Sequence, residues 1–234
     1  MNTNHNKRFK IVDRRAAWLL ALGTAFCALP AAAQTAGSVM IRAGATQINP
    51  NVDSGDLSPP SLPGTKASIR SDTRLSGGLT YMVTSNIALD LPLALPFTHE
   101  IDGDGAINGV GKIGEVKVLP IRLLAQYRFL APDSMLRPYA GAGVTYAKHY
   151  KARSTAALSV LTGGTPANPT TIEIKSKFAA TVQLGASFAI DKRWFVDANV
   201  MHTFLKTRAT LSTGQTLDMK VDPNSFSLAV GYTF

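Results

Sequence analysis

The last nine residues of the chain alternate strictly between apolar side chains and small or polar ones. In an extended strand, one face would carry Phe226, Leu228, Val230, Tyr232 and Phe234, and the other Ser227, Ala229, Gly231 and Thr233. Such a strand, ending on an aromatic residue, is typical of a transmembrane β-barrel whose apolar face meets lipid and whose small face meets a crowded interior. A half-buried strand of a soluble β-sandwich has the same period, so the rest of the chain must decide between the two.

The N-terminus has the organisation of a secretory signal peptide. Five Lys and Arg residues precede the apolar run 16–29, and Ala31, Ala32 and Ala33 follow it, so that cleavage would leave Gln34 as the first mature residue. The run is too short for a transmembrane helix, which needs about 20 residues. We therefore expect a cleaved secretory signal peptide at 1–33 and one folded domain at 34–234.

The composition of residues 34–234 excludes several classes of protein. The formal charge falls from +9 for the whole chain to +5, because the signal peptide holds five Lys or Arg residues and one Asp. The single cysteine, Cys27, follows Phe26 rather than the small residue that lipidation needs, so neither a lipid anchor nor a disulfide is expected. No patch combines Arg with aromatic residues, which argues against nucleic acid, and the remaining positive charge favours anionic lipid headgroups.

Eight segments of this domain alternate in the same way, and none contains the run of about 18 apolar residues that a transmembrane helix requires. The segments are 38–48, 71–83, 87–98, 115–129, 137–151, 173–190, 194–207 and 220–234. Asp90, Arg122 and Gln126 must face a lumen, because placing them in lipid would cost several kcal/mol each. The connections 84–86, 130–135 and 191–193 are short, whereas 49–70, 99–114, 152–172 and 208–219 are long and polar; the alanine-rich stretch 152–161 predicts a short helix.

Aromatic residues fall near both ends of the predicted strands. Those near the short turns are Tyr81, Tyr127, Phe129, Phe188, Trp194, Tyr232 and Phe234, and those near the long loops are Phe97, Tyr146, Tyr150, Phe178, Phe204 and Phe226. Two such girdles flank the lipid-facing band of outer-membrane barrels, whereas a soluble barrel has no reason to sort its aromatic residues. We predict that 34–234 is an all-β domain, an eight-stranded antiparallel up-and-down transmembrane β-barrel with long extracellular loops and short periplasmic turns.

Several stretches resemble the outer membrane protein W (OmpW) family of small barrels. They are IRAG at 41–44, LTYMVTSNI at 79–87, PFTH at 96–99, LP at 119–120, LLAQY at 123–127, RPYAGAGV at 137–144, VDP at 221–223 and GYTF at 231–234. The resemblance covers nearly all of 37–234 in one register. It implies a passive channel in the outer membrane of a Gram-negative bacterium, with an apolar interior, that takes up small hydrophobic molecules.

The resemblance also implies where the channel narrows. The family has a leucine on the third strand and a tryptophan at the start of the sixth, and matched by register their places are taken here by Pro92 and Phe178. Pro92 removes a donor from the strand ladder, so a gate here would be wider or differently placed. Alternation from Gln183 turns Phe178 outward, so either a bulge intervenes or Phe178 has no role in the lumen.

The interior of an eight-stranded barrel is barely wide enough for its own side chains. We expect Arg42, Arg74, Asp90, Arg122, Gln126, Lys177 and Asp197 to point inward and to pair with one another as a plug. A continuous water pore is then not expected, and an apolar solute would have to leave sideways into lipid. Pro92 and Pro96, which cannot donate ladder hydrogen bonds, mark a candidate lateral opening.

Other functions find less support in the sequence. No Ser-His-Asp set and no pattern of metal ligands is spaced for chemistry, so we expect no enzyme, metal or cofactor, and His202 shares a face with Val200 and Phe204. The alternative to a channel is a closed structural barrel whose extracellular loops act in adhesion or receptor binding. The expected partners are outer-membrane lipid and lipopolysaccharide, the barrel-assembly machinery through the C-terminal Phe234, and small apolar solutes.

Overall fold

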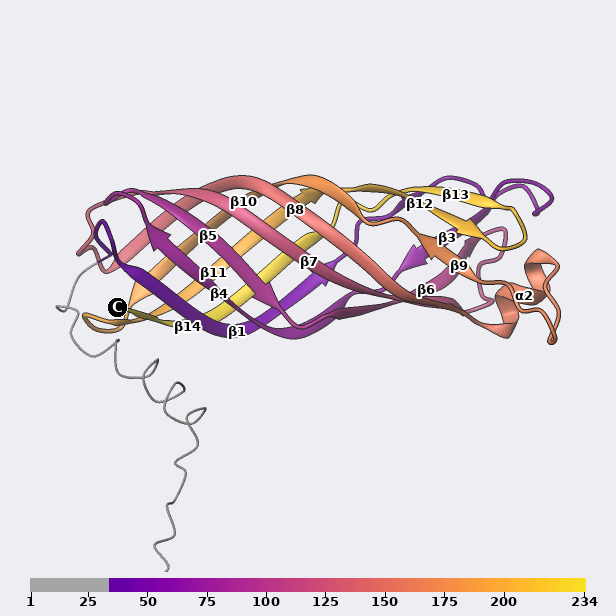
Figure 1. Ribbon diagram of the computed structural model, residues 1–234, viewed down its shortest axis with the longest axis horizontal. Helices are drawn as coiled ribbons and strands as arrows, with labels where there is room; N and C mark the ends of the chain where they lie inside the picture. The colour runs from indigo at the N-terminus through magenta and orange to yellow at the C-terminus, as the bar shows by residue number, and fades with distance from the viewer. Residues whose placement is uncertain (1–33) are drawn as a thin grey trace, which may run out of the picture.

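The computed structural model describes residues 34–234, so the predicted signal peptide at 1–33 lies outside the described residues. The wall of the molecule is an antiparallel sheet of β1 (Val39–Asn49), β4 (Asp72–Met82), β5 (Ile87–Ala94), β6 (Phe97–Gly105), β7 (Lys112–Arg128), β8 (Leu136–Ser154), β10 (Lys177–Ala189), β11 (Trp194–Phe204) and β14 (Asn224–Thr233). β5 and β6 follow one another along a single wall position, which gives eight positions. β1 pairs with β4 and β14, and β7 pairs with β8, so the sheet closes on itself. The predicted eight-stranded barrel is confirmed (Figure 1).

The strands continue well past the points where polar loops were expected. The segments 99–114 and 208–219 form hairpins, of β6 with β7 and of β12 (Lys206–Leu211) with β13 (Thr216–Lys220). β2 (Asp53–Ser54), β3 (Thr65–Ile69) and β9 (Ile172–Ile174) pair with these strands. The short helix expected in 152–161 is α2 (Ala156–Thr162), which begins after the N-cap Thr155 and ends at Gly163 in the left-handed conformation. These elements, on the right of Figure 1, form what we call the extension.

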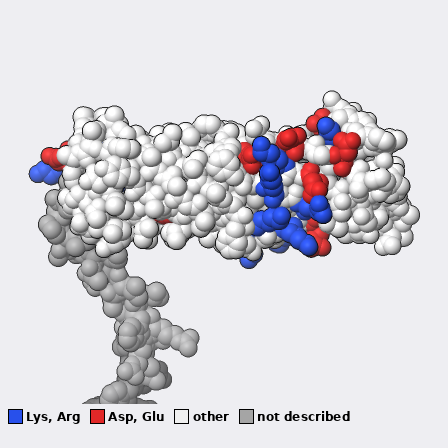
Figure 2. Space-filling model, turned by 90° about the horizontal axis from the view of Figure 1, so that it is seen from above, with Lys and Arg blue, Asp and Glu red and all other residues white. Residues whose placement is uncertain are grey.

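The membrane-spanning part exposes apolar side chains on its outer surface, whereas the extension buries its apolar side chains inside. In the spanning part the exposed side chains are aliphatic and include Leu75, Leu79, Leu89, Leu93, Ile121, Leu123, Val182, Leu184, Val200, Leu228 and Val230. In the extension the apolar side chains form an internal core that includes Ile101, Ile107, Val116, Leu158, Leu211, Leu217 and Met219. Figure 2 shows, on the visible face, a broad uncharged band next to a stripe of charged side chains. The extension is therefore built like a water-soluble protein, and the band like a lipid-facing one.

Apolar side chains point outward on β5 and inward on β6, and one extra residue between the two strands causes this change. Asp90 lies opposite Leu124 and Phe97 lies opposite Val118, so the first strand uses one residue more than β7 over this distance. An extra residue reverses the alternation that follows it. Leu95 is still exposed, as Leu93 is, whereas Phe97 beyond the extra residue is fully buried. The prediction that Phe97 belongs to the long-loop aromatic girdle is therefore wrong.

The remaining aromatic residues fit the girdles more closely. Tyr81, Tyr127, Phe129, Phe188 and Trp194 are exposed near the short turns, and Phe178, Phe204 and Phe226 are exposed near the extension. Rings pack edge to face in each group, with centroids 5.1 Å apart for Trp194 and Tyr232 and 4.6 Å apart for His202 and Phe204. Within 34–234, no helix has the length and apolar character needed to cross a membrane.

Replacing Leu228 by Arg tests the position of the lipid-facing band. Leu228 is exposed on β14 opposite Ala45 and Ala198, in the middle of the aliphatic surface. We expect Leu228→Arg to lower the free energy of unfolding by about 2–4 kcal/mol, because a guanidinium would enter the hydrocarbon. The measurement is a denaturant titration of the protein in lipid vesicles. Val160→Arg is the matched control, since Val160 is 80% exposed on α2, and an equal loss in both variants would contradict the assignment.

Candidate functional site

A buried ion pair crosses the lumen of the spanning part between β1 and β5. The Arg42 Nη2 donates to both carboxylate oxygens of Asp90 at 2.8 Å. The Thr80 hydroxyl bridges the pair, because it accepts from Arg42 Nη1 at 2.8 Å and donates to Asp90 at 2.6 Å. Asp90 has no exposed surface, and Arg42 has almost none. Each buried charge therefore has a partner of opposite sign. Without that partner, the remaining charge would be buried uncompensated in a medium of low dielectric constant.

A second network fills the lumen toward the short turns. Gln126 donates to Gln183 at 2.9 Å and accepts from Arg128 at 3.0 Å. The Arg128 guanidinium lies 4.6 Å from the centre of the Tyr139 ring, and Tyr139 donates to Asp197 at 2.9 Å. All five side chains are buried. The two networks form the polar plug, defined here as these residues with Arg42, Thr80 and Asp90.

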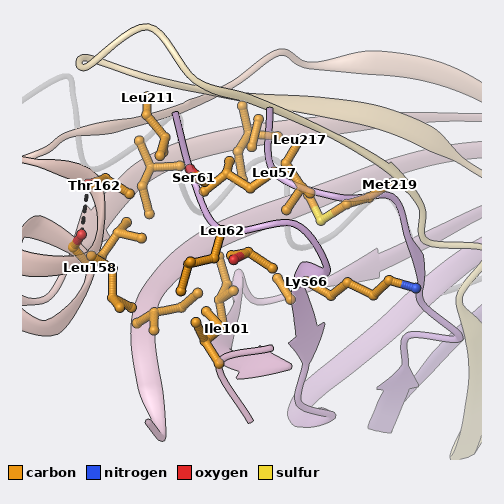
Figure 3. A pocket seen from close by; sticks show the side chains of 18 residues that line it. Leu57, Ser61, Leu62, Lys66, Ile101, Leu158, Thr162, Leu211, Leu217 and Met219 are labelled. Atoms are coloured by element: carbon orange, nitrogen blue, oxygen red, sulfur yellow. Dashed lines mark hydrogen bonds between the residues drawn. The ribbon is translucent and has the colours of Figure 1, made fainter. Parts of the chain in front are cut away.

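Two apolar cavities lie above the polar plug. The lower chamber, of about 60 Å³, is bounded by side chains that include Ile48, Ile69, His99, Val118, Arg122, Thr145, His149, Leu205 and Val221. The upper chamber, also about 60 Å³, lies in the extension and is lined by Leu57, Leu62, Ile101, Leu158, Leu217 and other apolar residues (Figure 3). Ile174 and Met219 line both chambers, so the two adjoin. Each is several times the roughly 10–15 Å³ that one water molecule needs.

Two histidines, His99 and His149, stand in the wall of the lower chamber. The ring of His99 stacks on Phe97, and its Nδ1 lies 2.8 Å from the carbonyl oxygen of Arg70. The Nδ1 of His149 is buried without a hydrogen-bond partner. Burial lowers the pKa of both imidazoles below the usual value, because it disfavours the charged form. Both histidines are therefore neutral at neutral pH, which keeps this wall of the chamber uncharged.

The backbone ladder is interrupted beside the chambers. β5 pairs with β7 only from Ile87 to Asp90, and pairing with β7 resumes at Phe97. Residues 91–96 therefore have no ladder partner on β7, although 119–123 still pair with β8. Pro92 and Pro96 lie on one side of this interruption, and Pro120 lies on the other. We call it the lateral gap.

The structure brings together most of the residues predicted to face the lumen. Arg42, Asp90, Arg122, Gln126, Pro92 and Asp197 are buried inside the barrel. The prediction for Lys177 was wrong, because Lys177 is exposed at the start of β10. Arg74 shares the inward face of β4 with Thr80, but it is partly exposed and pairs with Asp72 at 2.8 Å rather than with the polar plug.

Phe178 is also placed differently from the proposed gate position. The ladder of β10 with β8 runs without a bulge through Phe178, so simple alternation holds. Phe178 is 75% exposed on the outer surface, where its ring lies 4.7 Å from that of Tyr146. It belongs to the aromatic girdle and does not narrow the lumen.

The predicted set of inward residues omitted four members of the polar plug: Thr80, Arg128, Tyr139 and Gln183. Arg128 and Gln183 share the inward faces of β7 and β10 with residues that alternation did place correctly. Alternation therefore places these two side chains in the lumen as well. Nothing in the sequence indicates that Arg128 stacks on Tyr139, because that contact depends on the register of β7 with β8.

These features define a class of protein. A closed barrel with an aliphatic outer band, aromatic girdles and a polar lumen is an integral β-barrel of an outer membrane.

The chain belongs to the OmpW family, whose profile matches residues 35–234. Outer membrane protein W of Vibrio cholerae is 31% identical over 221 residues, which cover 92% of this chain and 97% of that protein. The crystal structure of OprG from Pseudomonas aeruginosa superposes with a TM-score of 0.77 at 27% identity, covering 86% of this chain and 97% of OprG. The solid-state NMR structure of AlkL in DMPC lipid bilayers gives a TM-score of 0.61 at 25% identity, covering 89% and 95%. The protein is thus an integral protein of the bacterial outer membrane.

Replacing Asp90 by Asn tests the ion pair of the polar plug. The variant leaves Arg42 buried without a counter-charge, so we expect the free energy of unfolding to fall by about 3–5 kcal/mol. Denaturant titration in lipid vesicles measures the loss. The double variant Arg42→Met with Asp90→Leu removes both charges and should recover most of the stability. A double variant no better than Asp90→Asn would contradict the pairing.

Imidazole titration tests the environment of the lower chamber. Because burial lowers the folded-state pKa values of His99 and His149, both should titrate by NMR below the ordinary value of about 6.5. The unfolded chain then takes up protons at a higher pH than the folded one. The contribution of the two neutral histidines to the free energy of unfolding is therefore fully present above about pH 6.5, and it is lost as the pH falls from there toward the folded-state pKa values. His99→Phe with His149→Phe should remove this part of the pH dependence. Titration of either histidine at or above 6.5 would contradict the burial.

Proposed function

We propose that the protein is a passive, narrow channel for small hydrophobic molecules, which enter through the extension and leave sideways into the membrane. The observation that supports this most is the arrangement of the lumen. Two adjoining apolar chambers end on a closed polar plug and lie beside the lateral gap. The relatives are outer membrane proteins by name, and the proposal involves no enzymatic step.

The chambers provide the first part of the route. Leu62 is 65% exposed and Leu161 is also exposed, yet both line the upper chamber. An apolar solute can therefore meet an apolar surface at the extracellular end before it is fully desolvated. From there Ile174 and Met219 connect the upper chamber with the lower one. Transfer from water into such surroundings releases about 25 cal/mol for each Å² of apolar surface buried.

The polar plug and the lateral gap provide the second part. A solute that continued downward would have to break hydrogen bonds of the Arg42–Asp90 and Gln126–Gln183 networks without replacing them. Moving sideways between 91–96 and 119–123 keeps it in apolar surroundings, because that wall faces acyl chains. Only short strand segments have to part, since the ladder is already interrupted there. Release is downhill and needs no energy source.

Gate and partner assignments follow from this route. Pro92 faces inward beside Leu93 and Ala94 in a small cavity of about 10 Å³ at the lateral gap. We infer that these residues form the gate, with Pro96 at its outer end. We also propose that the charged side chains next to the uncharged band contact lipopolysaccharide and that the strand ending at Phe234 is bound by the barrel-assembly machinery during insertion.

Passage into vesicles tests the channel. Proteoliposomes should speed transfer of a small apolar solute into the membrane, while sugars of similar size remain excluded. Ala94→Phe should slow the apolar solute by roughly tenfold, corresponding to about 1.4 kcal/mol on the barrier, because the new ring fills the inner mouth of the gap. Ala156→Phe, on the exposed surface of α2, is the matched control and should have no effect.

Two results would overturn the proposal. Free passage of sugars would mean an open water pore rather than a lateral route. Unchanged transfer in Ala94→Phe would mean that the solute does not use the lateral gap. Deleting the loop 163–171 should leave transfer intact, whereas a barrel that acts only through binding by its loops would show no transfer in any variant.

A further inference from the structure

Arg122 is a buried cation without a counter-charge. Its residue exposure is 4%, and its one hydrogen bond to a described residue runs from Nη2 to the Ser225 hydroxyl at 3.2 Å. Its Nε is buried and has no partner. No carboxylate of 34–234 forms an ion pair with it. Removing a guanidinium from water in this way is unfavourable unless an anion or several acceptors replace the lost hydration.

The other buried arginines of the described chain have more partners than Arg122, although the Nε of Arg128 is also buried without one. Arg42 has the carboxylate of Asp90, and Arg128 has Gln126, Ser187 and the Tyr139 ring. Arg137 donates to carbonyl oxygens of the short-turn end, including that of Gln34 at 2.8 Å. With one hydrogen bond, Arg122 has the fewest partners of these four. The difference is not explained by the fold, since the same interior supplies partners to its neighbours.

Arg122 lies where the proposed route turns. It lines the lower chamber together with Thr145, and it also lines the small cavity at the lateral gap together with Pro92. The side chain therefore borders both the apolar space above and the sideways exit. A molecule held by the guanidinium would have its remaining atoms in the chambers, among residues such as Ile174 and Met219.

We propose that Arg122 binds the carboxylate of an aliphatic acid whose apolar tail occupies the two chambers. This inference rests on the proposed function and narrows its substrate class from apolar molecules to amphipathic acids. The planar guanidinium matches a carboxylate through two parallel N–H donors, and Nε is one donor already available. Asn199 borders the same small cavity and donates its Nδ2 to Asp197 at 3.1 Å, so it places no carboxylate of its own beside Arg122.

Selection follows from the contrast between the head and the tail of the ligand. The chambers offer apolar contact to any small alkyl chain, whether it ends in a carboxylate or in a hydroxyl. Only the carboxylate supplies the missing negative charge and satisfies the Nε donor. Inorganic anions supply the charge but leave the chambers empty. An amphipathic acid therefore combines both contributions, and it releases its tail into lipid when the head group leaves Arg122.

Binding of octanoate and octanol to the protein in lipid nanodiscs tests this proposal. Calorimetry against protein-free nanodiscs should give tighter binding for octanoate, and octanoate should shift the Nε–H NMR signal of Arg122. Arg122→Gln should weaken octanoate by roughly ten- to a hundredfold and leave octanol unchanged, because only the charged hydrogen bonds are lost. Arg122→Lys should recover part of the affinity. Lys206→Gln, on the exposed face of β12, is the control and should change neither ligand.

A folding control separates binding from structure. Arg122→Met removes an uncompensated buried charge, so the empty barrel should be as stable as the native one or more stable, as judged by thermal unfolding. Lower stability of Arg122→Met would mean that Arg122 is a structural residue and would overturn the proposal.

The outcomes distinguish the two proposals. Octanol binding with no preference for octanoate would overturn the role of Arg122 and leave the hydrophobic channel standing. Acetate or chloride competing as well as octanoate would mean an inorganic anion site, and it would also overturn the proposal. Failure of both octanol and octanoate to bind would overturn the apolar chambers and the proposed function together.

Discussion

Lipid cannot hydrogen-bond a backbone N–H or C=O, and this constraint governs the spanning part of the protein. Pairing of β1 with β14 and of β7 with β8 leaves no free edge, so nearly every backbone group within the band is satisfied by a neighbour. Residues 91–96 are the exception opposite β7, and prolines occur there because they have no N–H to satisfy. The lateral gap is thus the place where the wall tolerates unpaired backbone at the least cost.

Much of the fold is readable from the sequence because side-chain alternation has the same period as the pleat. The short turns, the eight wall positions and the outward aliphatic faces all follow from it. Alternation fails where one residue is added, and Phe97 shows why. In the sequence Phe97 continues the alternation of Leu93 and Leu95, which would place its ring outside. The extra residue before it turns the ring inward. A bulge is a property of two strands in register, which a single segment does not reveal.

The site was predictable in kind but only partly in detail. The cost of charge in lipid placed Asp90, Arg122 and Gln126 inside, and the structure agrees. The cost of placing a charge in lipid does not determine the direction of Lys177, because this residue lies beyond the lipid-facing band and can face water on the outer surface. The apolar core of the extension was hidden for a related reason. Its strands bury the apolar face, as in a soluble protein, within segments that their Gly, Asp and Thr content marks as loops.

The lumen has a closed part and a part that can bind a ligand. In the polar plug the charges of Arg42 and Asp90 compensate one another and packed side chains fill the space, although Arg128 Nε and Gln183 Nε2 have no partner there. Above it, Arg122 and the two chambers leave both charge and apolar surface without partners. An amphipathic ligand gains free energy where a charge and apolar surface are available together, and it therefore stops above the polar plug. Because the lateral gap lies at this same level, the stopping point and the exit coincide, which makes sideways release the shortest path to lower free energy.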